Sequence, residues 1–469
     1  MTDSVRALVF LLLHAPLALA FSAASVIAQV FLAVVLLLGL WYALVNPRLE
    51  RVAYIAAYFV GSEVLWRMTG SNPFWETGKY AIALLFFVAL VRTDRLRGPF
   101  PIFVYFISLL PSLVLPLANV ANDAILGDIS YYLSGPLALT ISTWFFWQLK
   151  LNATQLQRLF TCLAAPTVGV GAIAVSKVLT AQTVVFTNSS NFATSGGFGP
   201  NQVSASLGLG ALIVFLAGMM NASGRVFKIC CFVLALGLVT LSALTFSRTG
   251  FYTAALTSVI AAVFLIRERR LRFQMLVGMG LVIIAGYFVI LPRLDVWTEG
   301  KLGKRLANTQ LTGRDRIALG DLQIFLANPI FGIGPGQARD RRTTDVGVTA
   351  AHTEFSRLLA EHGLFGLLAL LMLVLLSVMH FRRARTPEAQ ALVAATISWS
   401  FLFMAVSAMR LAAPAFMYGL AAVTLLTTPS LPAAMPDKRK VTDTEPVQAE
   451  AHPATPTEAD PIIEGIIEA

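Results

Sequence analysis

The stretch ASVIAQVFLAVVLLLGLWYALV, residues 24–45, contains no charged side chain and is long enough to cross a membrane. A helix needs about 20 apolar residues to span the hydrocarbon core of a bilayer, which is roughly 30 Å thick. Such runs recur along the chain without alternating between apolar and polar residues, which favours helices over the strands of a transmembrane barrel. The sequence therefore predicts an all-α fold, a polytopic bundle of 12–14 transmembrane helices. The predicted spans are 5–21, 24–45, 52–68, 77–91, 99–118, 131–149, 159–180, 203–221, 229–246, 250–266, 273–291, 355–380, 389–408 and 412–428.

The composition agrees with a membrane protein. Of the 469 residues, 57% are hydrophobic and only 13% are charged, whereas a soluble domain carries about 25% charged residues. The net charge is +10, but the basic residues lie in short loops between the spans and do not form one face. Nucleic acid is therefore not an expected partner, and membrane lipid is. The cysteines Cys162, Cys230 and Cys231 fall in predicted spans and show neither a disulfide framework nor the spacing of metal ligands.

Lysine and arginine concentrate in every second connection between the predicted spans. The intervening loops, such as 119–130 and 181–202, contain neither residue. Because short positively charged loops stay on the cytoplasmic side, both termini are predicted to be cytoplasmic. The basic residues of these loops are Arg48, Arg51, Arg92, Arg95, Arg97, Lys150, Arg158, Arg225, Lys228, Arg267, Arg269, Arg270, Arg272, Arg382, Arg383, Arg385, Lys438, Arg439 and Lys440.

The chain divides into three predicted regions. Residues 1–190 hold the N-terminal spans, and residues 191–428 hold the remaining spans with one long outer loop, 292–353. Residues 429–469 form a cytoplasmic tail that is rich in Pro, Ala, Thr and Glu and is predicted to be disordered. The outer loop carries nine basic and six acidic residues, which the charge rule tolerates because that rule applies mainly to short loops.

Within the outer loop, RDRIALGDLQIFLAN (314–328) predicts an amphipathic helix on the membrane surface. Its apolar residues Leu319, Leu322, Phe325 and Leu326 recur at helical spacing, and Asn328-Pro329 should end the helix. The following residues, Ile-Phe-Gly-Ile-Gly-Pro-Gly, predict a tight turn because glycine and proline punctuate regular structure.

Three arginines are candidates for holding an anion. Arg248, in LTFSRTGF (244–251), is expected at the outer mouth of two helices, where it either reaches out to the membrane interface or forms a fixed anion site. Arg314 and Arg316 open the predicted amphipathic helix. An arginine fork and a helix N-terminus both suit phosphate, while the alternative is a solvated cluster paired with Asp315.

Four further residues are candidates of other kinds. His352, where the outer loop re-enters the membrane, can exchange a proton near neutral pH, although a histidine at a helix entry is usually structural. Glu63 and Arg67 stand four residues apart, which predicts an ion pair, with substrate binding as the alternative. Asn201 belongs to the glycine-rich stretch before a span and is a candidate for binding substrate. No metal site is predicted, because HExxH and cysteine partners are missing from the sequence.

Four motifs together resemble the O-antigen ligase and polymerase superfamily, and the resemblance covers roughly residues 190–425. They are Gly-Gly-Phe-Gly-Pro-Asn-Gln (196–202), Thr-Phe-Ser-Arg-Thr-Gly (245–250), Gly-Arg-Asp-Arg (313–316) with Asn-Pro-Ile-Phe-Gly-Ile-Gly-Pro-Gly (328–336), and Ala-His-Thr-Glu-Phe with Glu-His-Gly-Leu-Phe-Gly (351–366). The resemblance implies a bacterial inner-membrane glycosyltransferase with its active site facing the periplasm.

The resemblance also implies the substrates and the site. The donor would be a glycan linked to undecaprenyl pyrophosphate, and the acceptor lipid A-core or a growing polysaccharide. No metal or other cofactor would be needed, and a single displacement would invert the anomeric carbon. Arg248, Arg314 and His352 would be catalytic, and Arg316, Arg67, Glu63 and Asn201 would bind the pyrophosphate or the glycan.

Two other functions stay open at this point. A polymerase of the same superfamily would extend O-antigen or exopolysaccharide repeats by the same donor chemistry. A transporter of polyprenyl-linked saccharides is disfavoured, because the sequence shows no internal repeat and its candidate residues gather on one predicted face.

Overall fold

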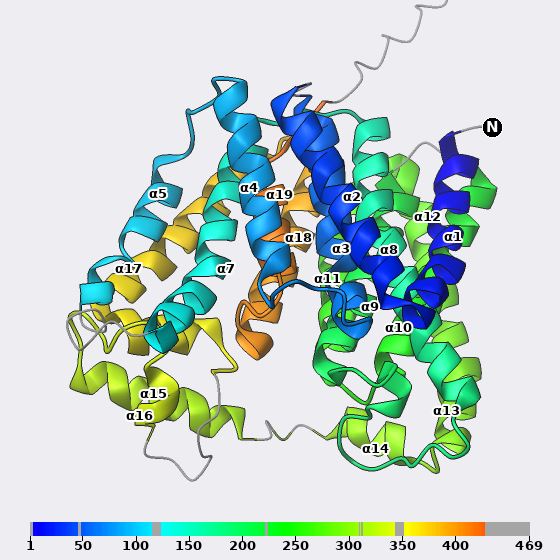
Figure 1. Ribbon diagram of the computed structural model, residues 1–469. Helices are drawn as coiled ribbons and strands as arrows, with labels where there is room; N and C mark the ends of the chain where they lie inside the picture. Colours follow the sequence, from blue (N-terminus) through cyan, green and yellow to red (C-terminus); the bar gives the residue numbers. More distant parts are fainter. Residues whose placement is uncertain are drawn as a thin grey trace, which may run out of the picture. The chain divides into compact units, whose positions relative to one another are not determined.

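The computed structural model describes residues 3–45, 48–114, 123–220, 224–308, 310, 313–342 and 351–426. These residues form a bundle of helices with a single short pairing of two-residue strands, which confirms the predicted all-α transmembrane fold (Figure 1). The long helices stand side by side, while three short outer-loop helices lie at one end of the bundle.

The helices and strands have the following bounds. The first part of the chain contains α1 (Asp3–Ala23), α2 (Ser25–Leu44), α3 (Leu49–Met68), α4 (Thr77–Arg92), α5 (Phe100–Ile107), η1 (Pro111–Leu113), α7 (Asp123–Gln148), β1 (Lys150–Leu151) and α8 (Ala153–Thr180). The second part contains η2 (Ala193–Ser195), α9 (Pro200–Met220), α10 (Arg225–Leu244), α11 (Arg248–Leu265), α12 (Arg269–Ile284), η3 (Ala285–Ile290), α13 (Leu291–Trp297), α14 (Lys301–Ala307), α15 (Arg314–Ala327), α16 (Ala338–Arg341), α17 (Glu354–Arg383), α18 (Pro387–Ser407), α19 (Ala413–Leu420) and β2 (Thr424–Leu425).

Every predicted span overlaps one of these helices. Within the described ranges, nine helices are long and apolar enough to cross a membrane by length and composition. The other predicted spans coincide with α3, α4, α5, α7 and α19, of which α5 and α19 have only 8 residues each. Eight residues rise about 12 Å in a helix, so these two cross only part of a bilayer.

One predicted boundary is wrong. The outer loop was expected to begin at 292, but an apolar helix runs on from Leu271 to Trp297. Within it, η3 is a π-helix that ends at Ile290, two residues before Pro292. Proline lacks the N–H that an α-helix would use one turn back, and a wider turn accommodates that loss without ending the helix.

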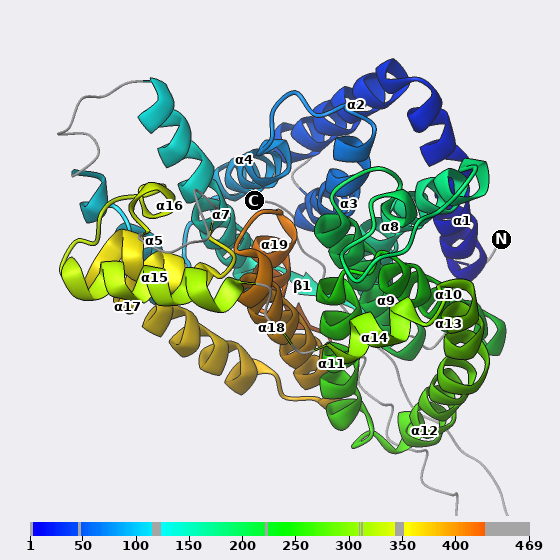
Figure 2. The same cartoon turned by 90° about the horizontal axis from the view of Figure 1, so that it is seen from below.

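Nearly all residues of helix α9 are buried, and Figure 2 shows this helix among α8, α10 and α11. It contacts α8, α10 and α11. A Cβ on Gly250 of α11 would lie 1.7 Å from the Ser204 carbonyl oxygen of α9, so only glycine permits this approach. The glycine in Thr-Phe-Ser-Arg-Thr-Gly therefore holds the start of α11, and with it Arg248, against the start of α9.

The predicted cytoplasmic loops meet at one end of the bundle. Arg92 Nε donates to the Leu44 carbonyl oxygen at 3.1 Å, and Arg95 Nη1 donates to that of Gln148 at 3.2 Å. Strands β1 and β2 pair in parallel there, with Lys150 opposite Thr424. The basic loops after α2, α4 and α7 thus lie at one end of the bundle.

At the other end, the turn 330–336 docks onto a break in α17. Gly363 has φ 60° and ψ −136°, outside the helical region. The Leu364 N–H donates to the Pro329 carbonyl oxygen at 2.7 Å, and the Gly334 N–H donates to that of Glu361 at 2.9 Å. Two of the sequence motifs therefore form one structural unit.

Helix α15 begins at Arg314 and ends at Ala327, as predicted from its sequence. It packs on α17 through Ile317, Gly320, Asp321 and Ile324, which are buried. The predicted apolar face looks outward: Leu319, Leu322 and Leu326 are 59%, 42% and 69% exposed. An exposed apolar row on a helix at the end of the bundle suits the surface of a bilayer.

Replacing Gly363 by alanine should destabilise the protein strongly. The new Cβ would lie 2.4 Å from the Pro329 carbonyl oxygen and 2.5 Å from that of Ile330, both backbone atoms. The backbone conformation alone costs a non-glycine residue about 1–3 kcal/mol. Thermal unfolding of the detergent-solubilised variant measures the loss. Gly280→Ala, at a helical position with nothing within 4 Å, is the control, and equal unfolding temperatures for the two variants would contradict the docking.

Candidate functional site

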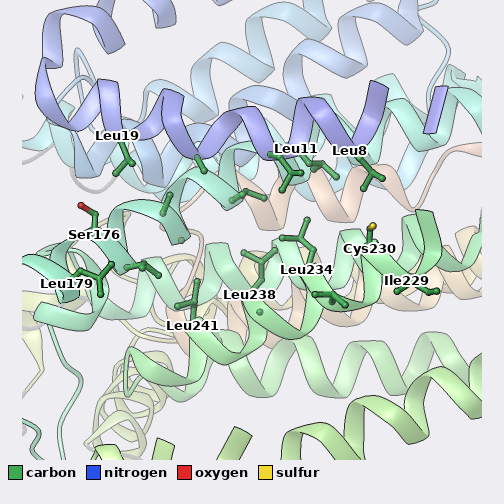
Figure 3. A pocket seen from close by; sticks show the side chains of 18 of the residues that line it. Leu8, Leu11, Leu19, Ser176, Leu179, Ile229, Cys230, Leu234, Leu238 and Leu241 are labelled. Atoms are coloured by element: carbon green, nitrogen blue, oxygen red, sulfur yellow. The ribbon is translucent and has the colours of Figure 1, made fainter. Parts of the chain in front are cut away.

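Two cavities differ in what they can do chemically. A cavity of about 890 Å³ lies between α1, α8 and α10 and is lined almost entirely by apolar side chains. Figure 3 shows Leu11 and Leu19 of α1 across this space from Leu234 and Leu238 of α10. The lining of this cavity contains no charged group. A second cleft, of about 340 Å³, is lined by two of the candidate residues, Arg248 and Arg314.

This arginine cleft lies between α11, α18, the end of α14 and the start of α15. The residues it takes from α11 recur at helical spacing along one face from Arg248 to Leu256, a rise of about 12 Å. The cleft therefore joins a charged end to an apolar flank. Its lining consists of Arg248, Thr249, Tyr252, Thr253, Leu256, Leu306, Asn308, Arg314, Leu402 and Val406.

Arg248 is the first residue of α11, and its guanidinium bridges to the outer loop. Nη2 donates to the Gln310 carbonyl oxygen at 2.6 Å, and Nη1 donates to the Asn308 carbonyl oxygen. These bonds use two of the five N–H groups of a guanidinium. Phe246, two residues earlier, is buried and has φ +57°, a conformation that costs a non-glycine residue about 1–3 kcal/mol. The surrounding packing holds this strained turn in place.

Asn201 supports that turn from α9. Its Oδ1 accepts a hydrogen bond from Ser247 Oγ at 2.7 Å, and Ser204 Oγ donates to the Ser247 carbonyl oxygen at 2.9 Å. Asn201 is not among the residues that line the cleft. The structure therefore places it behind Arg248.

Arg314 lines the cleft from the first position of α15, after Gly313 with φ +81°. Burial and the nearby cations Arg248, Arg410 and Arg305 lower the pKa of Arg314. Arg316 stands two residues further along, about 200° round the helix. It is exposed and does not line the cleft, so the structure brings only the first of these two arginines to Arg248.

His352 lies beside a cation that sequence reasoning missed. Arg410 Nη2 donates to His352 Nδ1 at 3.3 Å and to the Ala351 carbonyl oxygen at 3.1 Å. Burial, followed by the charges of Arg410, Arg314 and Arg342, lowers the pKa of His352 to about 4. The imidazole is therefore neutral at pH 7.

The Glu63–Arg67 pair holds the turn that carries Arg410. Arg67 Nη2 donates to Glu63 Oε1 at 2.6 Å, and Arg67 Nη1 donates to the Arg410 carbonyl oxygen at 3.2 Å and to Gln202 Oε1 at 2.8 Å. Glu63 Oε2 accepts from the Ala412 N–H at 2.7 Å. The expected ion pair is thus present, with its side chains 0% and 1% exposed. It holds Arg410 through hydrogen bonds to the backbone of the turn.

Arg410 and Gln202 were not predicted. The signal for Arg410 lay in the sequence, where it is the only charged residue between 389 and 436. A lone arginine in apolar surroundings is costly and marks a functional candidate. Gln202 carried no such signal, because its partner Arg67 stands 135 residues away.

Asp315, next to Arg314, is exposed to solvent, and the buried carboxylates of α15 and α17 are bonded to other arginines. Asp321 accepts from Arg342 Nε at 2.7 Å. In α17, Arg357 bonds to both Glu354 and Glu361, and the side chains of all three residues are 2% exposed. The cluster of Arg248, Arg305, Arg314 and Arg410 thus presents net positive charge. Within the described ranges, no group of three or more His, Cys, Asp or Glu residues could hold a metal ion; metal independence stays a prediction.

A protein-family model described as O-antigen ligase matches residues 229–371. This match confirms the resemblance that the sequence motifs predicted. The matched segment includes Arg248, Arg314, Arg316 and His352, whereas Glu63, Arg67, Asn201 and Arg410 lie outside it. No curated protein matches the chain. The chain is a multi-pass membrane protein, and part of it is similar to the O-antigen ligase family.

Proposed function

We propose that this protein, through its O-antigen ligase region, transfers a glycan from undecaprenyl pyrophosphate to an acceptor hydroxyl at the periplasmic face of the bacterial inner membrane. The observation that carries the proposal is the arginine cleft, where Arg248 and Arg314 meet beside an apolar flank. A lipid-linked diphosphate joins the same two chemical parts, an anion and a hydrocarbon chain.

The cationic end suits a diphosphate. Four arginines stand close enough for Arg248, Arg410 and Arg305 to lower the pKa of Arg314. Like charges held together in a partly buried place repel one another, and an anion between them relieves that repulsion. Arginine also donates two parallel hydrogen bonds to a phosphate, which fixes its orientation.

The apolar flank suits the lipid. Leu256 of α11 and Leu402 and Val406 of α18 line the same cleft as the two arginines. These two helices belong to the set that is long and apolar enough to cross a membrane. A polyprenyl chain lying between them would stay in hydrocarbon while its diphosphate reaches the arginines at the end of the bundle.

The reaction follows from this placement. The acceptor oxygen forms a bond to the anomeric carbon of the glycan, and the bond from that carbon to the diphosphate oxygen breaks with its electron pair. The departing diphosphate gains negative charge, which Arg248 and Arg314 stabilise more in the transition state than in the bound substrate. His352 takes up the hydroxyl proton or orients the hydroxyl. One displacement inverts the anomeric configuration.

Reconstitution tests the proposal and separates its two forms. We expect purified protein in proteoliposomes to release undecaprenyl pyrophosphate from a lipid-linked glycan when lipid A-core is supplied. A ligase should do nothing with the donor alone, whereas a polymerase should join donor repeats to one another. The transferred product, separated on a gel, and the released lipid diphosphate are measured together. Failure to release diphosphate with either acceptor, from correctly inserted protein, would rule out both forms.

A further inference from the structure

We propose that Arg410 is a positioning residue, which fixes His352 as the neutral tautomer with its proton on Nε2. In the proposed glycan transfer, on which this role rests, His352 then acts as a hydrogen-bond donor to an oxygen of donor or acceptor and not as the general base. The hydroxyl proton of the acceptor passes to an oxygen of the departing diphosphate, which gains negative charge as its bond to the anomeric carbon breaks. The tautomer is a property of the protein without substrate, so it can be measured whether or not the protein transfers a glycan.

The tautomer follows from the one contact between the two side chains. Arg410 Nη2 stands 3.3 Å from His352 Nδ1. A guanidinium has N–H donors and no acceptor, so Nδ1 must offer its lone pair. A neutral imidazole carries one proton, and it therefore resides on Nε2. That nitrogen can donate, and it has no lone pair with which to accept the hydroxyl proton.

The backbone fixes Arg410 in this position at three points. The Ala408 N–H donates to the His352 carbonyl oxygen at 3.1 Å, the Ala412 N–H donates to Glu63, and the Arg410 carbonyl oxygen accepts from Arg67. Arg410 also bonds to the Ala351 carbonyl oxygen at 3.1 Å. Both a side-chain contact and a main-chain hydrogen bond thus join this turn to His352.

The turn that carries Arg410 and the turn that carries Arg248 are strained at the same position relative to their arginines. Ala408 has φ 50° and ψ −153°, and Phe246 has φ 57°. Each stands two residues before its arginine. A non-glycine residue in such a conformation persists only where the surrounding structure holds it, and such positions cluster at functional sites. Both strained turns aim an arginine at the same cluster.

The electrostatics agree with a donor role. The charged groups that act on His352 are Arg410, Arg314 and Arg342, and all three disfavour a second proton on the ring. The acids Glu354 on α17 and Glu63 on α3 are each bonded to an arginine, and Asp321 on α15 is bonded to Arg342. A base with a pKa of about 4 is badly matched to a reaction near pH 7, since general bases work best near the operating pH.

The test reads the ring nitrogens directly. Protein labelled with ¹⁵N-histidine has five such residues, and His352→Gln assigns the His352 signals by difference. We expect a protonated Nε2 and an unprotonated Nδ1 from pH 8 down to about 5. In Arg410→Gln the pKa of His352 should rise by about 1 or more, because one adjacent cation is gone. Arg410→Lys should stay closer to the wild type.

The control is Arg293→Gln, which removes an exposed arginine of α13 and should leave the His352 signals unchanged. A proton on Nδ1 in the wild type, or an unchanged His352 pKa in a folded Arg410→Gln protein, would overturn the inference. If Arg410→Gln does not fold, the wild-type tautomer and the Arg410→Lys titration still decide it. Should the protein transfer no glycan, the proposed function fails while the spectra still test the tautomer.

Activity gives a second readout. The wild-type rate of glycan transfer should be independent of His352 titration between pH 5 and pH 8. Arg410→Gln should likewise show no new loss of rate on the acidic side, because a protonated His352 still carries the Nε2 proton with which it donates. A wild-type rate that falls with a pKa assigned to His352 in this range would show that the histidine works as the base.

Discussion

Arg314→Ala lowers the rate of glycan transfer by about 10²–10³-fold, while Arg316→Ala changes it by no more than a few-fold. The large loss is the typical cost of removing one fixed donor that stabilises charge in a transition state. Arg314 lines the arginine cleft, whereas Arg316 is exposed on another face of the same helix. The two variants remove the same side chain from nearly the same place in the sequence.

The measurement is the initial rate of product formation in proteoliposomes, at saturating donor and with matched amounts of inserted protein. Arg314 is a cleaner probe than Arg248, because Arg248 also holds the carbonyl oxygens of Asn308 and Gln310. The rate should respond through kcat more than through KM, since the charge develops during the reaction. Equal rates for the two variants would remove the reason to place the diphosphate in this cleft.

Arg357→Met destabilises the protein by about 3–5 kcal/mol, the cost of breaking a buried ion pair by removing one partner. Arg357 bonds to Glu354 and Glu361 inside the bundle, and its side chain is 2% exposed. Without it, two buried carboxylates face each other with no cation between them. The free energy is obtained from reversible unfolding in mixed micelles, or ranked by thermal unfolding.

The partner variants isolate the electrostatic cause. The triple variant Glu354→Gln, Arg357→Met, Glu361→Gln removes all three charges and should regain much of the lost stability, because replacing a buried ion group as a whole is often neutral. If the triple variant is as unstable as Arg357→Met, lost packing of the long side chain explains the effect and the charges do not.

The positions of the helices were largely predictable, because membrane crossing depends on local runs of apolar residues. Helix α15 was predicted to its first residue from the spacing of its apolar residues, and Asn328-Pro329 marks its end in the sequence. The extension of α13 to Trp297 was missed, because Pro292 is tolerated where a π-helical stretch precedes it. That wider turn is a property of the folded helix and leaves no pattern in the residues.

The candidate site was predictable in part. The match to residues 229–371 covers Arg248, Arg314 and His352, which the motifs had singled out. The motifs could not separate Arg314 from Arg316, because the helix phase that turns one inward is set by packing on α17. Nor could they show that Glu63 and Arg67 serve Arg410, which required the fold to bring α3 beside a turn that follows α18.

The amino-acid order alone determined that this chain has many helices able to cross a membrane, and it predicts which of its loops share a side. Both are set by the solvation of short segments, whose cost does not depend on distant residues. The tertiary structure alone decided which polar groups meet. His352 and Arg410 are 58 residues apart, and Arg67 and Gln202 are 135 apart. Contacts over such separations exist only once the helices have packed, because a buried polar group accepts whichever partner the packing brings within hydrogen-bond reach.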